Sequence, residues 1–130
     1  MPRKKMKLLI IDDEKDICNF VKLLFKKKGF LTYSALSATR ALNIVKKAKP
    51  NIALLDIYLK KGMDGLGLLG KIKEIAPDCR CIMVTWDKAQ AKTKEAKALG
   101  AFSYLTKPLT TSELFKAAER AVCDIRKRGC

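Results

Sequence analysis

The chain has 130 residues and a hydrophobic fraction of 48%, which suits one globular domain of ordinary size. No apolar run approaches the roughly 20 residues of a membrane span, and the apolar stretch near the N-terminus is too short for a signal peptide, so we expect a cytoplasmic protein. The net charge of +15 would favour contact with polyanions. The basic residues are nevertheless spread along the whole chain, without aromatic interleaving, so we expect a solvated basic surface and no specific nucleic-acid or membrane binding.

Strand-like and helix-like stretches alternate along the sequence. In chain order we expect a strand at 7–11, a helix carrying Ile17, Phe20, Val21 and Leu24, a strand at 30–35, an amphipathic helix around 41–45 and a buried strand at 51–56. A helix at 65–76, a strand at 81–85, a helix at 89–99, a strand at 101–106 and a last helix from Thr110 follow. The pattern Thr110-x-x-Glu113 is a capping box, which marks the start of a helix.

Five strands that alternate with five helices predict parallel β-α-β units with helices on both faces of one sheet. The expected fold class is α/β, a doubly wound five-stranded parallel sheet with strand order 2-1-3-4-5. We expect a single domain over residues 1–130, with a core at about 6–127. In such sheets, ligands bind outside the carboxyl ends of the strands, where the strand order reverses.

Polar residues stand at the ends of four of the expected strands. The first strand runs into Asp12 and Asp13, the third into Asp56, the fourth ends at Thr85, and the fifth runs into Lys107. Each residue alone has an ordinary explanation, such as helix capping for Asp13 or solvation for Lys107. Together they place three carboxylates, a hydroxyl and an ammonium at one edge of the sheet, which capping and solubility rarely produce.

This set of groups suits phosphoryl chemistry with a divalent cation. Three clustered carboxylates suit a hard cation with oxygen ligands, and Mg²⁺ is usually held by one or two carboxylates together with waters and a phosphate. A hydroxyl and a lysine can bind the phosphoryl oxygens as charge develops on them. An aspartate carboxylate can itself be the nucleophile and form an aspartyl-phosphate.

In this order and at these strand ends, Asp12-Asp13, Asp56, Thr85 and Lys107 resemble the receiver domain of bacterial response regulators, which has the flavodoxin-like fold of chemotaxis regulators. The resemblance covers about residues 6–127. It implies a phosphorelay signalling domain that is no enzyme beyond its own phosphoryl transfer and loss. By this resemblance Asp56 accepts a phosphoryl group from a histidine kinase or a histidine phosphotransfer protein.

The resemblance also implies how Mg²⁺ would be held. Asp13, Asp56 and the backbone carbonyl of Tyr58 would bind the ion directly. Asp12 would support the ion through water. The same resemblance implies no other cofactor.

Four further residues take roles from the resemblance. Lys107 would pair with the phosphoryl group, and its peptide bond to Pro108 would be cis. Thr85 would bond to the phosphoryl group and move toward it, and Tyr104 would turn inward when Thr85 moves. The face formed by the fourth helix, the fifth strand and the fifth helix would change on phosphorylation.

The sequence departs from the family pattern in three places. The loop "DIYLKKGMDG", which begins at Asp56, lacks the usual proline and is one residue longer. Trp86 stands where the family usually has a small residue, and the basic charge is extreme. Trp86 and the basic charge keep open a pseudo-receiver or a basic docking module, in which binding replaces phosphotransfer, whereas the intact acidic set argues against it.

Three other activities suggested by sequence motifs account for fewer of the polar residues at the strand ends. The segment "GLGLLG", Gly65 to Gly70, matches the dinucleotide-binding pattern, but that pattern must directly follow a strand, and eight residues, 57–64, intervene here. A phosphatase of the haloacid dehalogenase type needs a second aspartate where Tyr58 stands. No P-loop pattern is present. We therefore expect none of these three activities.

The expected partners follow from the receiver reading. A kinase or phosphotransfer protein would supply the phosphoryl group. The chain ends just past the last expected helix, so the output would be docking on a downstream protein or an output domain that these residues do not include. A stand-alone regulator and a receiver from a longer protein fit this sequence equally well.

Overall fold

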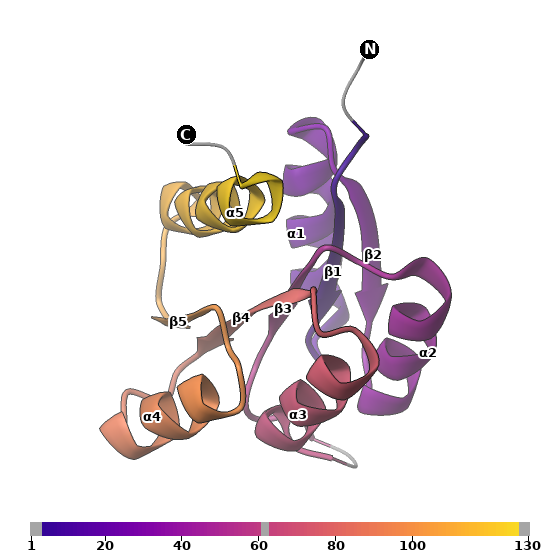
Figure 1. The fold of residues 1–130 in the computed structure, drawn as a ribbon. Helices are drawn as coiled ribbons and strands as arrows, with labels where there is room; N and C mark the ends of the chain where they lie inside the picture. The colour runs from indigo at the N-terminus through magenta and orange to yellow at the C-terminus, as the bar shows by residue number, and fades with distance from the viewer. Residues whose placement is uncertain (1–3, 61–62, 128–130) are drawn as a thin grey trace.

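The computed structural model describes residues 4–60 and 63–127, which form five strands and five helices in the predicted order (Figure 1). The strands are β1 (Lys7–Ile11), β2 (Leu31–Ala35), β3 (Ile52–Leu55), β4 (Arg80–Thr85) and β5 (Ser103–Thr106), and the helices are α1 (Lys15–Lys27), α2 (Ala38–Ala48), α3 (Gly65–Ile75), α4 (Gln90–Ala98) and α5 (Thr111–Arg126). All strand pairs are parallel, in the order β2-β1-β3-β4-β5. The predicted fold class and strand order are confirmed.

The sheet separates two layers of helices (Figure 1). The helices α1 and α5 cover one face, and α2, α3 and α4 cover the other. Along β1, Leu8 and Ile10 pack beneath α1 and α5, whereas Leu9 and Ile11 pack on the opposite face. Because both faces are covered, every β1 position from Leu8 to Ile11 is buried, and each such side chain contributes roughly 1.5–3 kcal/mol. This explains why β1 reads as a continuous apolar run.

Side-chain caps fix where two helices near the strand ends begin. The carboxylate of Asp64 accepts a hydrogen bond from the amide of Gly67 at 2.8 Å and caps α3. Thr110 and Glu113 form both bonds of the predicted capping box at the start of α5. Each cap stabilises its helix by about 1 kcal/mol. Because Asp64 caps α3, capping does not explain the presence of Asp56.

The buried face of α1 and the first residues of two strands differ from the prediction. The buried residues of α1 are Cys18, Val21 and Phe25, whereas Phe20, which the helical spacing grouped with the apolar set, is 57% exposed. Spacing alone does not separate the centre of an apolar stripe from its edge. The strands β2 and β5 begin one and two residues later than predicted.

The helix α4 is the least anchored of the five. Only Ala96 among its nine residues is buried, because alanine and lysine supply most of the segment. A helix that buries so little apolar surface opens at low cost in free energy. Within the described ranges, no helix is long and apolar enough to cross a membrane.

Candidate functional site

The strand ends that carry polar residues meet at one edge of the sheet. The register of β1 and β3 pairs Ile11 with Leu55, so the residues that follow them, Asp12 and Asp56, leave the sheet side by side. Thr85 is the last residue of β4. The strand β5 runs beside β4 and pairs Thr106 with Thr85. Lys107, which follows Thr106, therefore lies at the same edge.

Lys107 lies between two carboxylates. Its Nζ donates a hydrogen bond to Oδ2 of Asp56 at 3.2 Å and stands 3.6 Å from Oδ2 of Asp12. The three side chains are only 17%, 12% and 8% exposed, so their attraction is screened less than that of a surface pair. The Lys107–Pro108 peptide bond is cis, as predicted. Lys107 is therefore part of the acidic cluster and not one more solvated lysine.

Burial governs the protonation of Asp12. Loss of water around its carboxylate raises the pKa of Asp12 above its ordinary value, and the charges of Asp56 and Asp13 raise it further. The amide of Glu14, which donates to Oδ1 at 2.9 Å, and the ammonium of Lys107 act in the opposite direction. Because burial is the largest effect, the ionised Asp12 carries a cost that a nearby cation would relieve.

Backbone contacts orient Asp56. Its Oδ1 accepts a hydrogen bond from the amide of Tyr58 at 3.1 Å. Gly65, the first residue of α3, donates to the carbonyl of Ile57 at 2.6 Å. A Cβ atom at Gly65 would overlap the backbone carbonyl of Asp56 and stand 2.5 Å from Cα of Ile57. Gly65 therefore serves this close packing of α3 on the end of β3. In the sequence, Gly65 stands out only as the first glycine of the dinucleotide-binding pattern, which does not apply here.

Asp13 contacts the loop that follows β3. Its Oδ2 accepts a hydrogen bond from the amide of Lys60 at 3.1 Å. Within the described ranges, no group of three acidic, cysteine or histidine side chains is placed to hold a metal ion, so the three aspartates do not form a closed cage. The carboxylates of Asp13 and Asp56 and the carbonyl of Tyr58 are nevertheless oxygen donors, and Mg²⁺ commonly takes one or two carboxylates plus water. This donor set fits the ion.

Hydrogen bonds through Asp87 connect the loop after β3, the end of β4 and the strand β5. Its amide donates to Oγ1 of the fully buried Thr85 at 3.4 Å, and its backbone carbonyl accepts from the hydroxyl of Tyr104 at 2.7 Å. Its carboxylate accepts from the hydroxyl of Tyr58, and this bond lowers the pKa of Asp87 and raises that of Tyr58. No sequence pattern marked this connection, because it joins loops whose residues are 29 positions apart.

Apolar side chains border the acidic edge. Trp86 is 64% exposed and lines a hollow of about 250 Å³ that also reaches Asp56 and Lys107. Phe20 of α1 lines the same hollow. The unexpected exposure of Phe20 therefore places an aromatic ring near the site instead of in the core.

The comparisons with known families agree with this geometry. The family model described as the response regulator receiver domain matches residues 8–119. This chain belongs to that family. As a receiver domain, it is 34% identical over 114 residues to sporulation initiation phosphotransferase F of Bacillus subtilis, and the match covers 88% of this chain and 91% of that protein.

Two further matches differ in how much of the other protein they cover. The CheY-like receiver domain protein from Methanospirillum hungatei has a crystal structure that matches with a TM-score of 0.91 and 27% identity, over 97% of this chain and 100% of that one. A putative NtrX-like response regulator of Rickettsia bellii is 34% identical over 92% of this chain and 25% of its own length. The receiver domain thus spans about a quarter of this longer relative. Membership in this family supports a role in phosphorelay signalling.

Proposed function

We propose that Asp56 accepts a phosphoryl group from a phosphohistidine of a kinase or phosphotransfer protein, and that the modified domain signals through the face of α4, β5 and α5. The position of Lys107 carries this proposal. Its ammonium stands 3.2 Å from Oδ2 of Asp56, where it can meet a phosphoryl oxygen on the modified carboxylate. A preorganised cation at that place stabilises the charge that develops during transfer.

The transfer step uses the carboxylate of Asp56 as the nucleophile. One carboxylate oxygen forms a bond to phosphorus while the phosphorus–nitrogen bond of the phosphohistidine breaks, and the imidazole leaves with the bonding electron pair. Tyr58 and Lys107 hold the two oxygens of the carboxylate. The nucleophile is therefore oriented before a donor arrives, which lowers the entropic cost of the step.

The chain offers a place for Mg²⁺ beside this nucleophile. Asp13, Asp56 and the carbonyl of Tyr58 would hold the ion, and Asp12 would act through water. The bound ion supplies positive charge to the phosphoryl oxygens. The mutual repulsion that helps to raise the pKa of Asp12 supports a cation at this position.

The switch would pass from Thr85 to Tyr104. The Thr85 hydroxyl now accepts a hydrogen bond from the amide of Asp87, and it can donate to a phosphoryl oxygen. Movement of Thr85 would displace Asp87 and with it the partner of the Tyr104 hydroxyl. Because α4 has one buried residue, this helix can follow at low cost, as a shift between existing states.

A basic docking module without phosphotransfer is the second candidate. The net charge of +15 and the exposed Trp86 beside the site favour it. In that case Asp56 and Lys107 would keep their ion pair as a structural contact. Binding of an acidic partner would then be independent of any phosphodonor.

Phosphodonor labelling separates the two candidates. The protein is incubated with acetyl phosphate and Mg²⁺, and its intact mass is measured. We expect a gain of one phosphoryl group that disappears in Asp56→Asn and persists in Asp16→Asn, which alters an exposed carboxylate on α1. Because Trp86 could block a small donor, Trp86→Ala is labelled in parallel. No mass gain in either the unaltered protein or Trp86→Ala would favour the docking module.

A further inference from the structure

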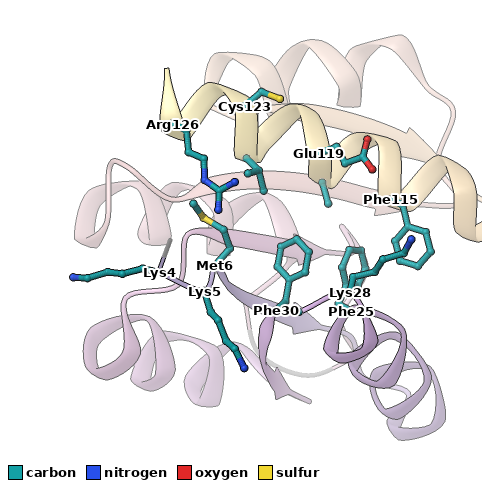
Figure 2. Close-up of a pocket in the computed structure, with 13 residues that line it drawn as sticks. Lys4, Lys5, Met6, Phe25, Lys28, Phe30, Phe115, Glu119, Cys123 and Arg126 are labelled. Carbon is teal, nitrogen blue, oxygen red and sulfur yellow. The ribbon is translucent and has the colours of Figure 1, made fainter. Parts of the chain in front are cut away.

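A separate hollow lies at the opposite end of the sheet from Asp56. It has a volume of about 520 Å³ and lies between the residues before β1, the end of α1 and the helix α5 (Figure 2). Met6, which lines it, precedes β1, whereas Asp12 follows that strand. A strand of this length spans roughly 16 Å, so the hollow is distinct from the phosphoacceptor edge. Its volume is typical of sites for small molecules.

Phenylalanine rings form the apolar wall of this hollow. Phe25 of α1 is fully buried, and its ring packs edge-on against Phe30 and Phe115, each with a centroid distance of 5.2 Å. Val122 of α5 extends the apolar surface. The accessible rings of Phe30 and Phe115 offer an apolar surface on which an aromatic ligand can stack.

Positive charge borders the same wall. The hollow is lined by four cationic side chains and one carboxylate, which are Lys4, Lys5, Lys28, Arg126 and Glu119. In Figure 2, Arg126 extends from α5 toward the hollow, and Lys28 reaches toward the ring of Phe115, where its Nζ stands 4.7 Å from the ring centroid. The ion pairs found among residues 4–60 and 63–127 involve none of these four cations. Lys4 and Lys5 extend away from the hollow in Figure 2, so the charge available to a ligand is that of Arg126 and Lys28.

We propose that this hollow, the α1–α5 pocket, binds a small amphipathic organic anion. The apolar body of the ligand would lie against Phe30 and Phe115, whose rings pack on the buried Phe25, and its carboxylate, sulfonate or phosphate group would lie against Lys28 and Arg126. A neutral apolar ligand would leave the cations without partners. A simple inorganic anion would leave the aromatic wall uncovered.

Such a ligand would connect two elements of the proposed signalling domain. It would contact Lys28 at the end of α1 and Phe115 on α5 at once, and α5 belongs to the face proposed to switch. A ligand that binds only the folded state adds stability by mass action. We therefore expect occupation of the pocket to raise the melting temperature, with or without phosphorylation.

Two fluorescent probes test the pocket in the intact chain. Anilinonaphthalene sulfonate has an aromatic body and an anionic group, and N-phenylnaphthylamine has the same aromatic body without the anion. We expect the sulfonate to bind at least about fivefold more tightly than the neutral probe. The double reversal Lys28→Glu with Arg126→Glu should weaken the sulfonate about tenfold and change the neutral probe less than about twofold.

Matched variants locate the binding. Lys47→Glu with Lys94→Glu makes the same change of net charge at exposed positions of α2 and α4 and should leave both affinities within about twofold. Val122→Phe should fill the hollow and weaken both probes. Glu119→Gln, which removes the carboxylate, should tighten the sulfonate about twofold. Circular dichroism verifies that each variant is folded.

Three results would overturn the proposal. One is absence of sulfonate binding to the unaltered protein. Another is equal weakening by the two double reversals, which would mean general attraction to a basic surface. The third is full affinity in a folded Val122→Phe protein, which would place the probe elsewhere. If Val122→Phe does not fold, the comparison of the two double reversals decides.

Discussion

The hydroxyl of Tyr104 donates a 2.7 Å hydrogen bond to the backbone carbonyl of Asp87, which joins β5 to the loop before α4. The amide of Asp87 also holds Thr85, and its carboxylate holds the Tyr58 hydroxyl. A single residue thereby connects the two proposed switch residues with the loop after Asp56, the proposed phosphoacceptor. The hydrogen bond of Tyr104 should consequently stabilise the start of α4.

Loss of the Tyr104 hydroxyl should loosen that segment. Tyr104→Phe keeps the half-buried ring and removes one hydrogen bond of about 1 kcal/mol. Amide hydrogen exchange over residues 87–93 should become about fivefold faster. Tyr33→Phe is the matched control, because within the described residues the Tyr33 hydroxyl has no hydrogen-bond partner. Unchanged exchange in Tyr104→Phe would contradict the stabilising role of this bond.

Gly65 should be intolerant of any side chain. Because a Cβ atom there would overlap the backbone of Asp56, Gly65→Ala should lower the free energy of unfolding by about 2–3 kcal/mol. At Gly70, in the same helix, a Cβ atom would meet only Cδ2 of Leu99 at 3.9 Å. Gly70→Ala should therefore raise stability by about 0.5–1 kcal/mol. Urea unfolding of both variants measures the contrast, and equal stability would show that α3 does not need this close approach.

Neutralising Asp12 should stabilise the protein without metal. Its folded pKa lies above the unfolded value because of burial, so its protonation favours folding at low pH and that contribution is lost as pH rises through the folded pKa. Asp12→Asn removes the cost of ionising a buried carboxylate. The asparagine oxygen can still accept the hydrogen bond from the amide of Glu14. The stability advantage of Asp12→Asn should grow from pH 4 toward neutral pH and then level off. A stability difference between Asp12→Asn and the unaltered protein that does not change between pH 4 and neutral pH would contradict this pKa direction.

Mg²⁺ should stabilise the folded chain through Asp13. At ten times its dissociation constant, the ion should add about 1.4 kcal/mol, which raises the melting temperature by roughly 4–6 °C. NaCl at matched ionic strength separates this effect from screening. Asp13→Ala should remove the shift, whereas Asp16→Ala, which alters an exposed side chain of α1, should keep it. An equal shift in Asp13→Ala would mean that the ion binds elsewhere.

The sequence predicted most of this fold because its patterns are local. Apolar runs separated by amphipathic stretches determine a parallel sheet, and Asp12, Asp56, Thr85 and Lys107 could be placed at one edge by strand order alone. The structure brings these residues together: the ammonium of Lys107 lies 3.2 Å from the carboxylate of Asp56 and 3.6 Å from that of Asp12.

What the sequence did not predict depends on contacts between distant loops. The hydrogen bonds of Asp87 arise only when the loop after β3, the loop after β4 and the strand β5 meet. The need for glycine at position 65 arises from backbone proximity, which composition does not encode. Phe20 fits a helical stripe by spacing, yet the edge of that stripe faces the hollow beside the site. The helical spacing of apolar residues shows that a helix has an apolar stripe. Which residues of that stripe are buried depends on the neighbouring helices and strands.

The most direct measurement locates the phosphoryl group on the chain. After labelling with acetyl phosphate and Mg²⁺, borohydride reduces an acyl phosphate to an alcohol, and peptide mass spectrometry identifies the altered residue. We predict that the alteration lies at Asp56 and is absent from the other aspartates, Asp12 and Asp13 included. A labelled protein with unmodified Asp56, or equal labelling of Asp56→Asn, would contradict the proposed function.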